Sequence, residues 1–290
     1  MSTPTAPAEP SPPPTAAERP VDYGSYLLLD ELLGLQRPRS RGAAADAGAP
    51  SGDAEHPDEL LFIVVHQASE LWFKVILQEL DGLRAALAAR DESAGSAAAR
   101  VAGAAERSLW HIQRINALVR IVSAQLGALD TLPPQRFLQF RGYLGSSSGS
   151  QSVQFRAIEA ASGLREPHFL HVVREHGEVP AAVAEQLARP TLQELFLALL
   201  DDAGVAPEAL YLGPGPSTLF FVAEGLLEYE QQFARWRFAH VQLVERVIGP
   251  GTGGTGGTLG AKYLARTVAQ RFFPVLWEVR SRLYGASRGA

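Results

Sequence analysis

Two histidines lie on helical faces on which the other residues are mostly apolar. His240 lies in WRFAHVQLVERVIG, and helical spacing places it on one face with these large apolar side chains: Phe233, Trp236, Leu243, Val244 and Val247. A lone imidazole of this kind is more often a core histidine bonded to a carbonyl oxygen than a metal ligand. It would also meet the needs of a haem site, which requires one nitrogen aimed at iron within an apolar wall. Spacing alone leaves both interpretations open.

His66 lies in LFIVVHQASELWFK, where Phe62, Glu70 and Phe73 share its helical face. One interpretation is a boundary histidine that pairs with Glu70 one turn later. The other is an imidazole that handles a proton or a hydrogen bond beside an aromatic wall. The helical pattern does not choose between these two interpretations.

Phe137 and Arg141 form an i, i+4 pair in RFLQFRGYLG. A guanidinium beside an aromatic ring suits an amino-acid ligand, because it can hold a carboxylate through two parallel hydrogen bonds. A surface arginine is the more common explanation. Two small and polar loops, 144–152 and 250–258, are either linkers or segments that let the backbone approach a ligand closely. Neither loop has the lysine of a phosphate-binding P-loop.

The composition narrows the chemistry further. The 290 residues include no cysteine, which excludes disulfides, thiolate nucleophiles, zinc–cysteine sites and iron–sulfur clusters. A transition metal would need histidine or carboxylate ligands, and a haem iron would need histidine or, less often, tyrosine. The net charge is −5 and no basic block is present, so we expect no nucleic-acid partner.

Residues 1–20 lack the apolar core of a signal peptide, and we expect them to form a disordered Pro-rich tail. We expect no apolar stretch long enough to cross a bilayer, which takes about 18 residues. The expectation is therefore a cytoplasmic protein without a membrane partner.

Helical periodicity accounts for nearly all of the remaining chain. Long amphipathic patterns cover 57–90, about 95–128, 216–248 and 258–285, and shorter ones cover 23–36, 134–143, 150–163, 167–176, 180–188 and 191–203. Gly249 and Gly251 suit positions just beyond a helix C-terminus. With no period-2 strand pattern and no internal repeat, the sequence predicts an all-α, single-domain helical bundle over residues 21–290.

Four segments occur in a fixed order along the chain: YGSYLLLDELLGLQ, HPDELLFIVVHQASELWFK, FLQFRGYLGSSSGSQSVQFR, and WRFAHVQLVERVIG followed by GTGGTGG. Together they closely resemble the tryptophan 2,3-dioxygenase family from about Tyr23 to the last helix. The resemblance implies an all-helical fold with a haem pocket, one haem b per subunit with ferrous iron in the active form, and a homotetramer. It also implies that O₂ cleaves the indole C2–C3 bond of L-tryptophan to give N-formyl-L-kynurenine, in tryptophan catabolism through the kynurenine pathway.

The resemblance assigns roles around the haem to particular positions. His240 matches the proximal haem ligand, and is therefore the expected iron ligand. Ser148 and Gly149 match small residues at the haem edge. His66 matches the distal histidine that hydrogen-bonds the indole N–H, and is the expected catalytic residue. Phe62 matches an aromatic residue that lines the pocket.

The remaining matched positions concern the substrate. Arg141 matches the residue that holds the substrate carboxylate, and Phe137 matches a position that is tyrosine or phenylalanine in the family. Thr252 matches a residue that contacts the amino and carboxylate groups. Tyr23 and Tyr26 match N-terminal aromatics that a neighbouring subunit contributes to the pocket.

The chain departs from the family pattern at several points. Ser150 stands where an aromatic residue is common, and Ala239 stands where arginine is frequent. The loop from His240 to Thr252 is about two residues shorter than is usual in the family, and the 37–55 loop is longer than usual. These departures motivate an alternative, a related haem oxygenase that acts on a modified tryptophan or inserts one oxygen atom in a biosynthetic pathway. A helical binding protein without catalysis is a third hypothesis, disfavoured because the ligand and substrate positions are all retained.

Overall fold

The computed structural model describes residues 21–40, 56–89, 95–174, 177–213, 215–251 and 261–286. Within these ranges the regular structure is helical and no strand is present. This confirms the predicted all-α class. The chain forms two compact units, residues 1–37 and residues 38–290. The predicted tail, residues 1–20, lies outside the described ranges.

The first unit contains two short helices, α1 (Tyr23–Leu27) and α2 (Leu29–Leu33). The sequence predicted one helix over 23–36, and that prediction was wrong at its centre and at its end. Leu28 separates the two helices with φ 50°, in the left-handed region that a leucine rarely adopts. The Asp22 side chain caps α1 by accepting the Ser25 N–H at 2.8 Å.

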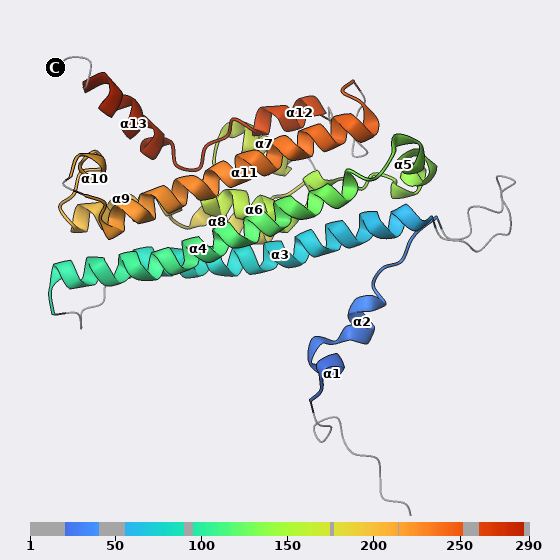
Figure 1. Ribbon diagram of the computed structural model, residues 1–290, viewed down its shortest axis with the longest axis horizontal. Coiled ribbons are helices and arrows are strands. Elements are labelled where there is room, and N and C mark those ends of the chain that lie inside the picture. Colours follow the sequence, from blue (N-terminus) through green and yellow to red (C-terminus); the bar gives the residue numbers. More distant parts are fainter. Residues whose placement is uncertain are drawn as a thin grey trace, which may run out of the picture. The chain divides into compact units, whose positions relative to one another are not determined.

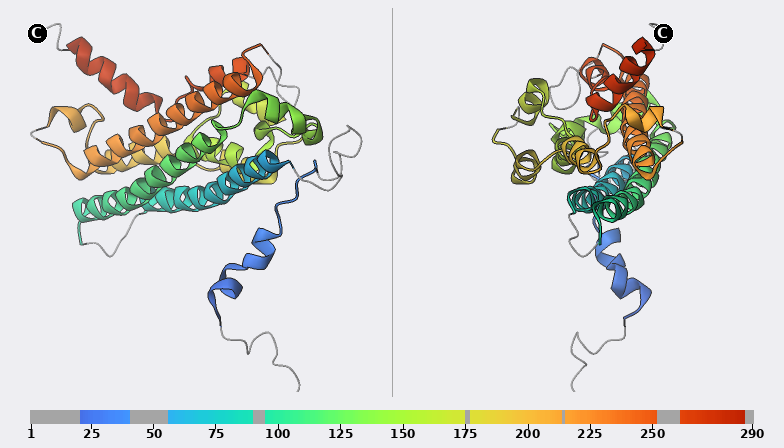
Figure 2. Two further views of the ribbon diagram at one scale, coloured as in Figure 1. Left: turned by 45° about the vertical axis from the view of Figure 1, so that its right-hand side comes forward. Right: turned by 90° about the vertical axis from the view of Figure 1, so that its left-hand side faces the viewer.

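Three long helices form the body of the second unit: α3 (Pro57–Ala88), α4 (Ala97–Leu129) and α11 (Thr218–Ile248). They lie side by side in Figures 1 and 2, with α4 in contact with both of the others. Capping side chains set where two of them begin, since Ser96 accepts the Ala99 N–H and Ser217 accepts the Phe220 N–H. Gly249 ends α11 with φ 89°, which confirms the predicted C-terminal glycine.

Shorter helices complete this unit. They are α5 (Pro134–Arg141), the 3₁₀ turns η2 (Gly142–Leu144) and η3 (Gly149–Gln151), α6 (Val153–Ser162), α7 (Pro167–Arg174), α8 (Ala181–Ala188), α9 (Leu192–Asp202), α10 (Ala209–Leu212), α12 (Ala261–Thr267) and α13 (Pro274–Ala286). Helices α5 to α9 match the predicted segments within a few residues, whereas α10 was not predicted. Helix α6 packs against α3 and α8.

The predicted single helix over 258–285 was wrong, because the described residues hold two helices with a break between them. In the break, the buried Glu230 carboxylate of α11 accepts the backbone N–H groups of Phe272 and Phe273, at 2.6 and 2.8 Å. The same carboxylate accepts the Trp277 indole N–H at 2.6 Å. Pro274 then opens α13, a position where its missing N–H costs nothing.

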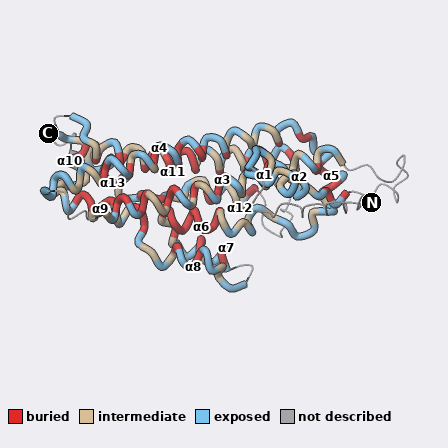
Figure 3. Tube along the Cα trace, turned by 90° about the horizontal axis from the view of Figure 1, so that it is seen from below, coloured by how far each residue is buried: buried red, intermediate tan, exposed pale blue. Residues whose placement is uncertain are grey.

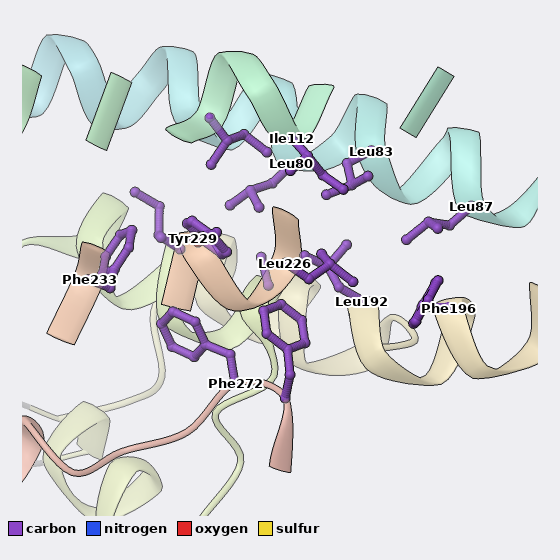
Figure 4. Packing of buried hydrophobic residues seen from close by; sticks show 14 of the residues in the cluster. Leu80, Leu83, Leu87, Ile112, Leu192, Phe196, Leu226, Tyr229, Phe233 and Phe272 are labelled. Atoms are coloured by element: carbon purple, nitrogen blue, oxygen red, sulfur yellow. The ribbon is translucent and has the colours of Figure 1, made fainter. Parts of the chain in front are cut away.

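The main hydrophobic core lies where α3, α4, α6, α9 and α11 meet (Figure 3). Fully buried residues from these helices pack together in Figure 4, among them Leu80, Ile112, Phe196 and Tyr229. Gly225 of α11 allows a close approach to α4, since a Cβ added there would lie 2.6 Å from Ile112 Cγ2. A smaller apolar cluster lies toward α5 and contains Val65, Phe137, Phe140 and Leu243, among others.

Helix α3 is long and apolar enough to cross a membrane by length and composition, with a mean hydropathy of 1.6 over its most apolar window. The expectation that no stretch reaches this limit was therefore wrong. One such helix is weak support for a membrane segment, because helices of soluble bundles pass the same test. Here α3 packs against α4, α6 and α9, while Leu60, Val64 and Leu71 are exposed.

Candidate active site

A largely apolar cavity of about 260 Å³ lies within the second unit. Its walls come from α3, the C-terminal part of α4, α5, the serine-rich turn before α6, α6 itself, and the C-terminal halves of α11 and α12. Both histidines singled out in the sequence line it, His66 from α3 and His240 from α11. The bundle therefore brings together two imidazoles that are far apart in the sequence.

The α3 wall presents the face expected from the sequence. Phe62, His66, Glu70 and Phe73 all line the cavity. One interpretation of the sequence paired His66 with Glu70, and the structure does not contain this pair. Instead, His66 Nδ1 lies 2.7 Å from the Phe62 carbonyl oxygen, and the Glu70 carboxylate accepts the Gln154 side-chain amide at 2.8 Å.

The hydrogen bond to Phe62 determines the tautomer of His66. A carbonyl oxygen can only accept, so Nδ1 carries the proton and Nε2 keeps its lone pair. Desolvation by the surrounding protein lowers the pKa of His66 below its ordinary 6.5, although the residue keeps an exposed surface and the Phe62 bond and Glu70 oppose this shift. At neutral pH the side chain is thus a neutral imidazole with one free acceptor.

The α11 wall presents His240 among Trp236, Leu243, Val244 and Val247, which confirms the apolar face read from the sequence. The Trp236 indole stacks on the imidazole, with ring centroids 5.5 Å apart and an interplanar angle of 30°. Burial, with a smaller contribution from His66, lowers the pKa of His240 to about 4. His240 is therefore a neutral imidazole at pH 7, the protonation state in which it can bind a metal.

Aromatic rings close the end of the cavity near α5. Phe137 is buried and lies 5.9 Å from Phe62, centroid to centroid, and Phe140 packs against both rings. This wall can receive a flat aromatic group, because offset and edge-to-face contacts between rings are favourable.

The turn before α6 supplies hydroxyl groups and an open backbone position. Ser148, Gly149 and Ser150 line the cavity, and the Ser148 and Ser150 hydroxyl oxygens lie 2.9 Å apart. A Cβ added at Gly149 would meet no atom within 4 Å. The two positions that the resemblance places at the haem edge therefore border the cavity, and Gly149 leaves open space beside its backbone.

A buried ionic cluster on the cavity wall was not predicted from the sequence. Arg156 and Glu159 of α6 and Arg237 of α11 line the cavity and are almost fully buried, with exposed fractions of 9%, 1% and 3%. Arg237 Nη2 donates to Glu159 Oε1 at 2.8 Å, and Arg156 Nη1 lies 2.8 Å from Oε2. An Arg and a Glu three residues apart look the same in sequence as a surface ion pair, so the pattern gave no signal.

The other positions assigned to the substrate differ in where they lie. Arg141, half-buried in the last turn of α5, is not among the residues that line the cavity. Thr252 lies outside the described residues. Tyr23 and Tyr26 belong to the first unit and are 76% and 75% exposed. Among the described residues, no group of three or more histidine and acidic side chains could hold a metal ion.

Comparison with known proteins gives one consistent result. A family model for tryptophan 2,3-dioxygenase matches residues 12–201 and 211–283. A tryptophan 2,3-dioxygenase from Nocardioides sp. is 38% identical over 281 residues, which cover 91% of this chain and 95% of the relative. The enzymes of the same name from Herpetosiphon aurantiacus and Anaeromyxobacter dehalogenans are 38% and 35% identical, and the matches cover 98% and 99% of their lengths.

Proposed function

This chain belongs to the tryptophan 2,3-dioxygenase family, and we propose that its cavity binds haem b and L-tryptophan and that O₂ cleaves the indole C2–C3 bond there to give N-formyl-L-kynurenine. The observation that carries this proposal is the pair of neutral imidazoles, His66 and His240, on the walls of one apolar cavity. The relatives named above are tryptophan 2,3-dioxygenases and give no support to the alternative, a related haem oxygenase that acts on a modified tryptophan or inserts one oxygen atom.

The residues present suit a haem. An apolar wall can cover a porphyrin face, and His240 is an imidazole with no hydrogen bond recorded within the described residues, so a nitrogen can bind iron. Ferrous haem bound there would supply the centre at which O₂ is activated. Trp236, stacked on His240, would hold the imidazole plane in one orientation.

His66 would orient the substrate. Its Nε2 lone pair is the acceptor that an indole N–H requires, and the Phe62 carbonyl fixes that tautomer. The aromatic wall of Phe62 and Phe137 would receive the indole ring. Fixing the reacting bond in this way can contribute several kcal/mol, up to about 7–11 in favourable cases.

We assign binding of the charged end of the amino acid to Arg141 and Thr252, which match the family positions with that role. We assign a contribution to the pocket of a neighbouring subunit to Tyr23 and Tyr26. The high exposure of both tyrosines supports a contact with another subunit. We further propose a homotetramer that works in the cytoplasm.

The iron ligand can be tested by substitution. We expect purified His240→Ala protein to lose its Soret band, because the substitution removes the proposed iron ligand. His66→Ala should retain the Soret band and bind L-tryptophan about tenfold more weakly, since one hydrogen bond is lost. Absorption spectra of both variants, before and after L-tryptophan, measure these effects. Haem retention by His240→Ala together with haem loss by His66→Ala would contradict the assignment.

A further inference from the structure

We propose that Arg156 and Arg237 form a carboxylate-binding subsite in the cavity wall, which takes a carboxylate of the molecule bound there. The inference rests on the proposed function, because it needs an acidic ligand in this cavity. The two sources of such a group are a porphyrin propionate and the carboxylate of the amino acid.

The net charge of the cluster formed by Arg156, Glu159 and Arg237 is the first observation that supports this proposal. Two guanidinium groups share one carboxylate, that of Glu159, so the cluster carries a formal excess of one positive charge. Tyr229 lies close to this cluster, but burial raises its pKa and its hydroxyl pairs with Ser162 at 2.6 Å, so it supplies no negative charge at neutral pH. A buried cation without a full counter-charge is costly, and an anion in the cavity would remove that cost.

Hydrogen-bond donors of the two arginines that have no partner are the second observation that supports this proposal. The Nε atoms of Arg156 and of Arg237 are buried and have no hydrogen-bond partner among the described residues, and Glu159 Oε2 meets Arg156 as an ion pair without a hydrogen bond. The guanidinium planes lie over aromatic rings, Arg156 over Phe155 at 4.8 Å and Arg237 over Phe272 at 5.3 Å. Each plane is thus fixed on one face by packing while a donor at its edge remains unpaired, on residues that line the cavity. A carboxylate is the group that satisfies such donors with charge-assisted hydrogen bonds.

The position of Arg141 strengthens the argument. The sequence pointed to Arg141 as the residue that binds a carboxylate, yet it does not line the cavity, whereas Arg156 and Arg237 do. Two subsites would serve a cavity whose proposed occupants, a porphyrin and an amino acid, both carry carboxylates.

The test compares ligands that carry a free carboxylate with analogues that lack it. Protein produced under haem limitation is titrated with protohaem and with its dimethyl ester, followed at the Soret band. Haem-loaded protein is titrated with L-tryptophan and with tryptamine, which lacks the carboxylate. We expect Arg156→Gln and Arg237→Gln to lower the preference for the ligand with the free carboxylate about tenfold in one of these pairs, the order expected for a charge-assisted hydrogen bond, and not to weaken binding of the analogue that lacks the carboxylate.

Two further variants separate ligand binding from a structural role. Glu159→Gln removes the competing negative charge, so it should raise the preference for the ligand with the free carboxylate, whereas a purely structural cluster would lose affinity for ligands with and without that carboxylate alike. Arg165→Gln is the matched control, because Arg165 also has a buried unpaired Nε but does not line the cavity. It should change neither preference.

Each outcome has one meaning. A loss of preference confined to protohaem over its ester identifies a porphyrin propionate, and a loss confined to L-tryptophan over tryptamine identifies the amino acid. Unchanged preferences in both pairs would overturn the subsite. Failure of the unsubstituted protein to bind either porphyrin would contradict the proposed function instead.

Discussion

At the scale of single residues, two imidazoles line the cavity, and their different surroundings suit them to different roles. His240 lies on an apolar wall and stacks on Trp236, which suits an iron ligand. His66 donates from Nδ1 to a backbone carbonyl, which leaves an acceptor at Nε2. Desolvation lowers the pKa of both imidazoles, so both are neutral at pH 7. The proposed function therefore starts from one imidazole nitrogen that could bind a metal and one hydrogen-bond acceptor.

This neutrality predicts how substrate binding depends on pH. Burial lowers the pKa of His66, so its acceptor is present at neutral pH and is lost as the pH falls through that lowered pKa, below 6.5. Protonation turns both ring nitrogens into donors. We expect the affinity for L-tryptophan to hold above pH 6.5 and to fall about five- to tenfold on the acid side, the worth of one hydrogen bond.

The measurement is a Soret titration with L-tryptophan at a series of pH values. The control ligand is 1-methyl-L-tryptophan, which has no indole N–H and should lack this acid step. An acid step of equal size for both ligands would mean that His66 does not accept the indole proton.

Residue roles could be predicted from the sequence only in part. The faces that carry His66 and His240 follow from helical spacing, and both faces line the cavity. The partner of His66 could not be read in this way, because Glu70 at i+4 is instead held by Gln154 from another helix. The role of Arg156 was equally hidden, since burial of an Arg–Glu pair depends on which helices pack over it.

At the scale of elements, helix α11 carries His240 and is fixed against α4 by close packing. Gly225 allows this approach, and its carbonyl accepts the Asn116 side-chain amide at 3.1 Å. Farther along, Gln232 donates to the Asn116 side-chain oxygen at 3.1 Å. The position of the candidate iron ligand therefore depends on the α4–α11 interface.

A pair of glycine substitutions tests this interface. Gly225→Ala would place a Cβ 2.6 Å from Ile112 Cγ2, and we expect the free energy of unfolding to fall by about 1–3 kcal/mol. Gly127→Ala, in the exposed part of α4 with no atom near its Cβ, should raise it by about 0.5–1 kcal/mol. Urea unfolding measures both. Equal stabilisation by the two substitutions would show that the helices do not approach this closely.

The break between α12 and α13 gives a second prediction at this scale. Glu230→Ala would leave the buried N–H groups of Phe272 and Phe273 without their acceptor. We expect a loss of about 3 kcal/mol or more in the free energy of unfolding. Glu278→Ala, which removes an exposed carboxylate 3.6 Å from Arg282, should cost under about 1 kcal/mol in the same urea experiment. Similar losses in both variants would contradict the role of Glu230.

Helix positions were largely predictable because amphipathic periodicity is local. Helices α3, α4 and α11 begin and end within about two residues of the predicted segments. The failures have identifiable causes. The break after α12 depends on Glu230, about forty positions earlier, and the break at Leu28 depends on a left-handed residue that its sequence does not favour.

At the scale of the whole molecule, the bundle places both histidines and the aromatic wall in one cavity within residues 38–290. The family relation extends over more than nine-tenths of the chain, so it covers every wall of that cavity. The homotetramer and the contribution of Tyr23 and Tyr26 to a neighbouring pocket stay predictions.

The most direct test of the central claim is the product formed from labelled oxygen. Haem-loaded protein, reduced and supplied with L-tryptophan and ¹⁸O₂, should give N-formyl-L-kynurenine that contains two labelled oxygen atoms, measured by mass spectrometry. A product with a single labelled atom, or L-tryptophan left unchanged by the reduced haem-loaded protein, would contradict the account.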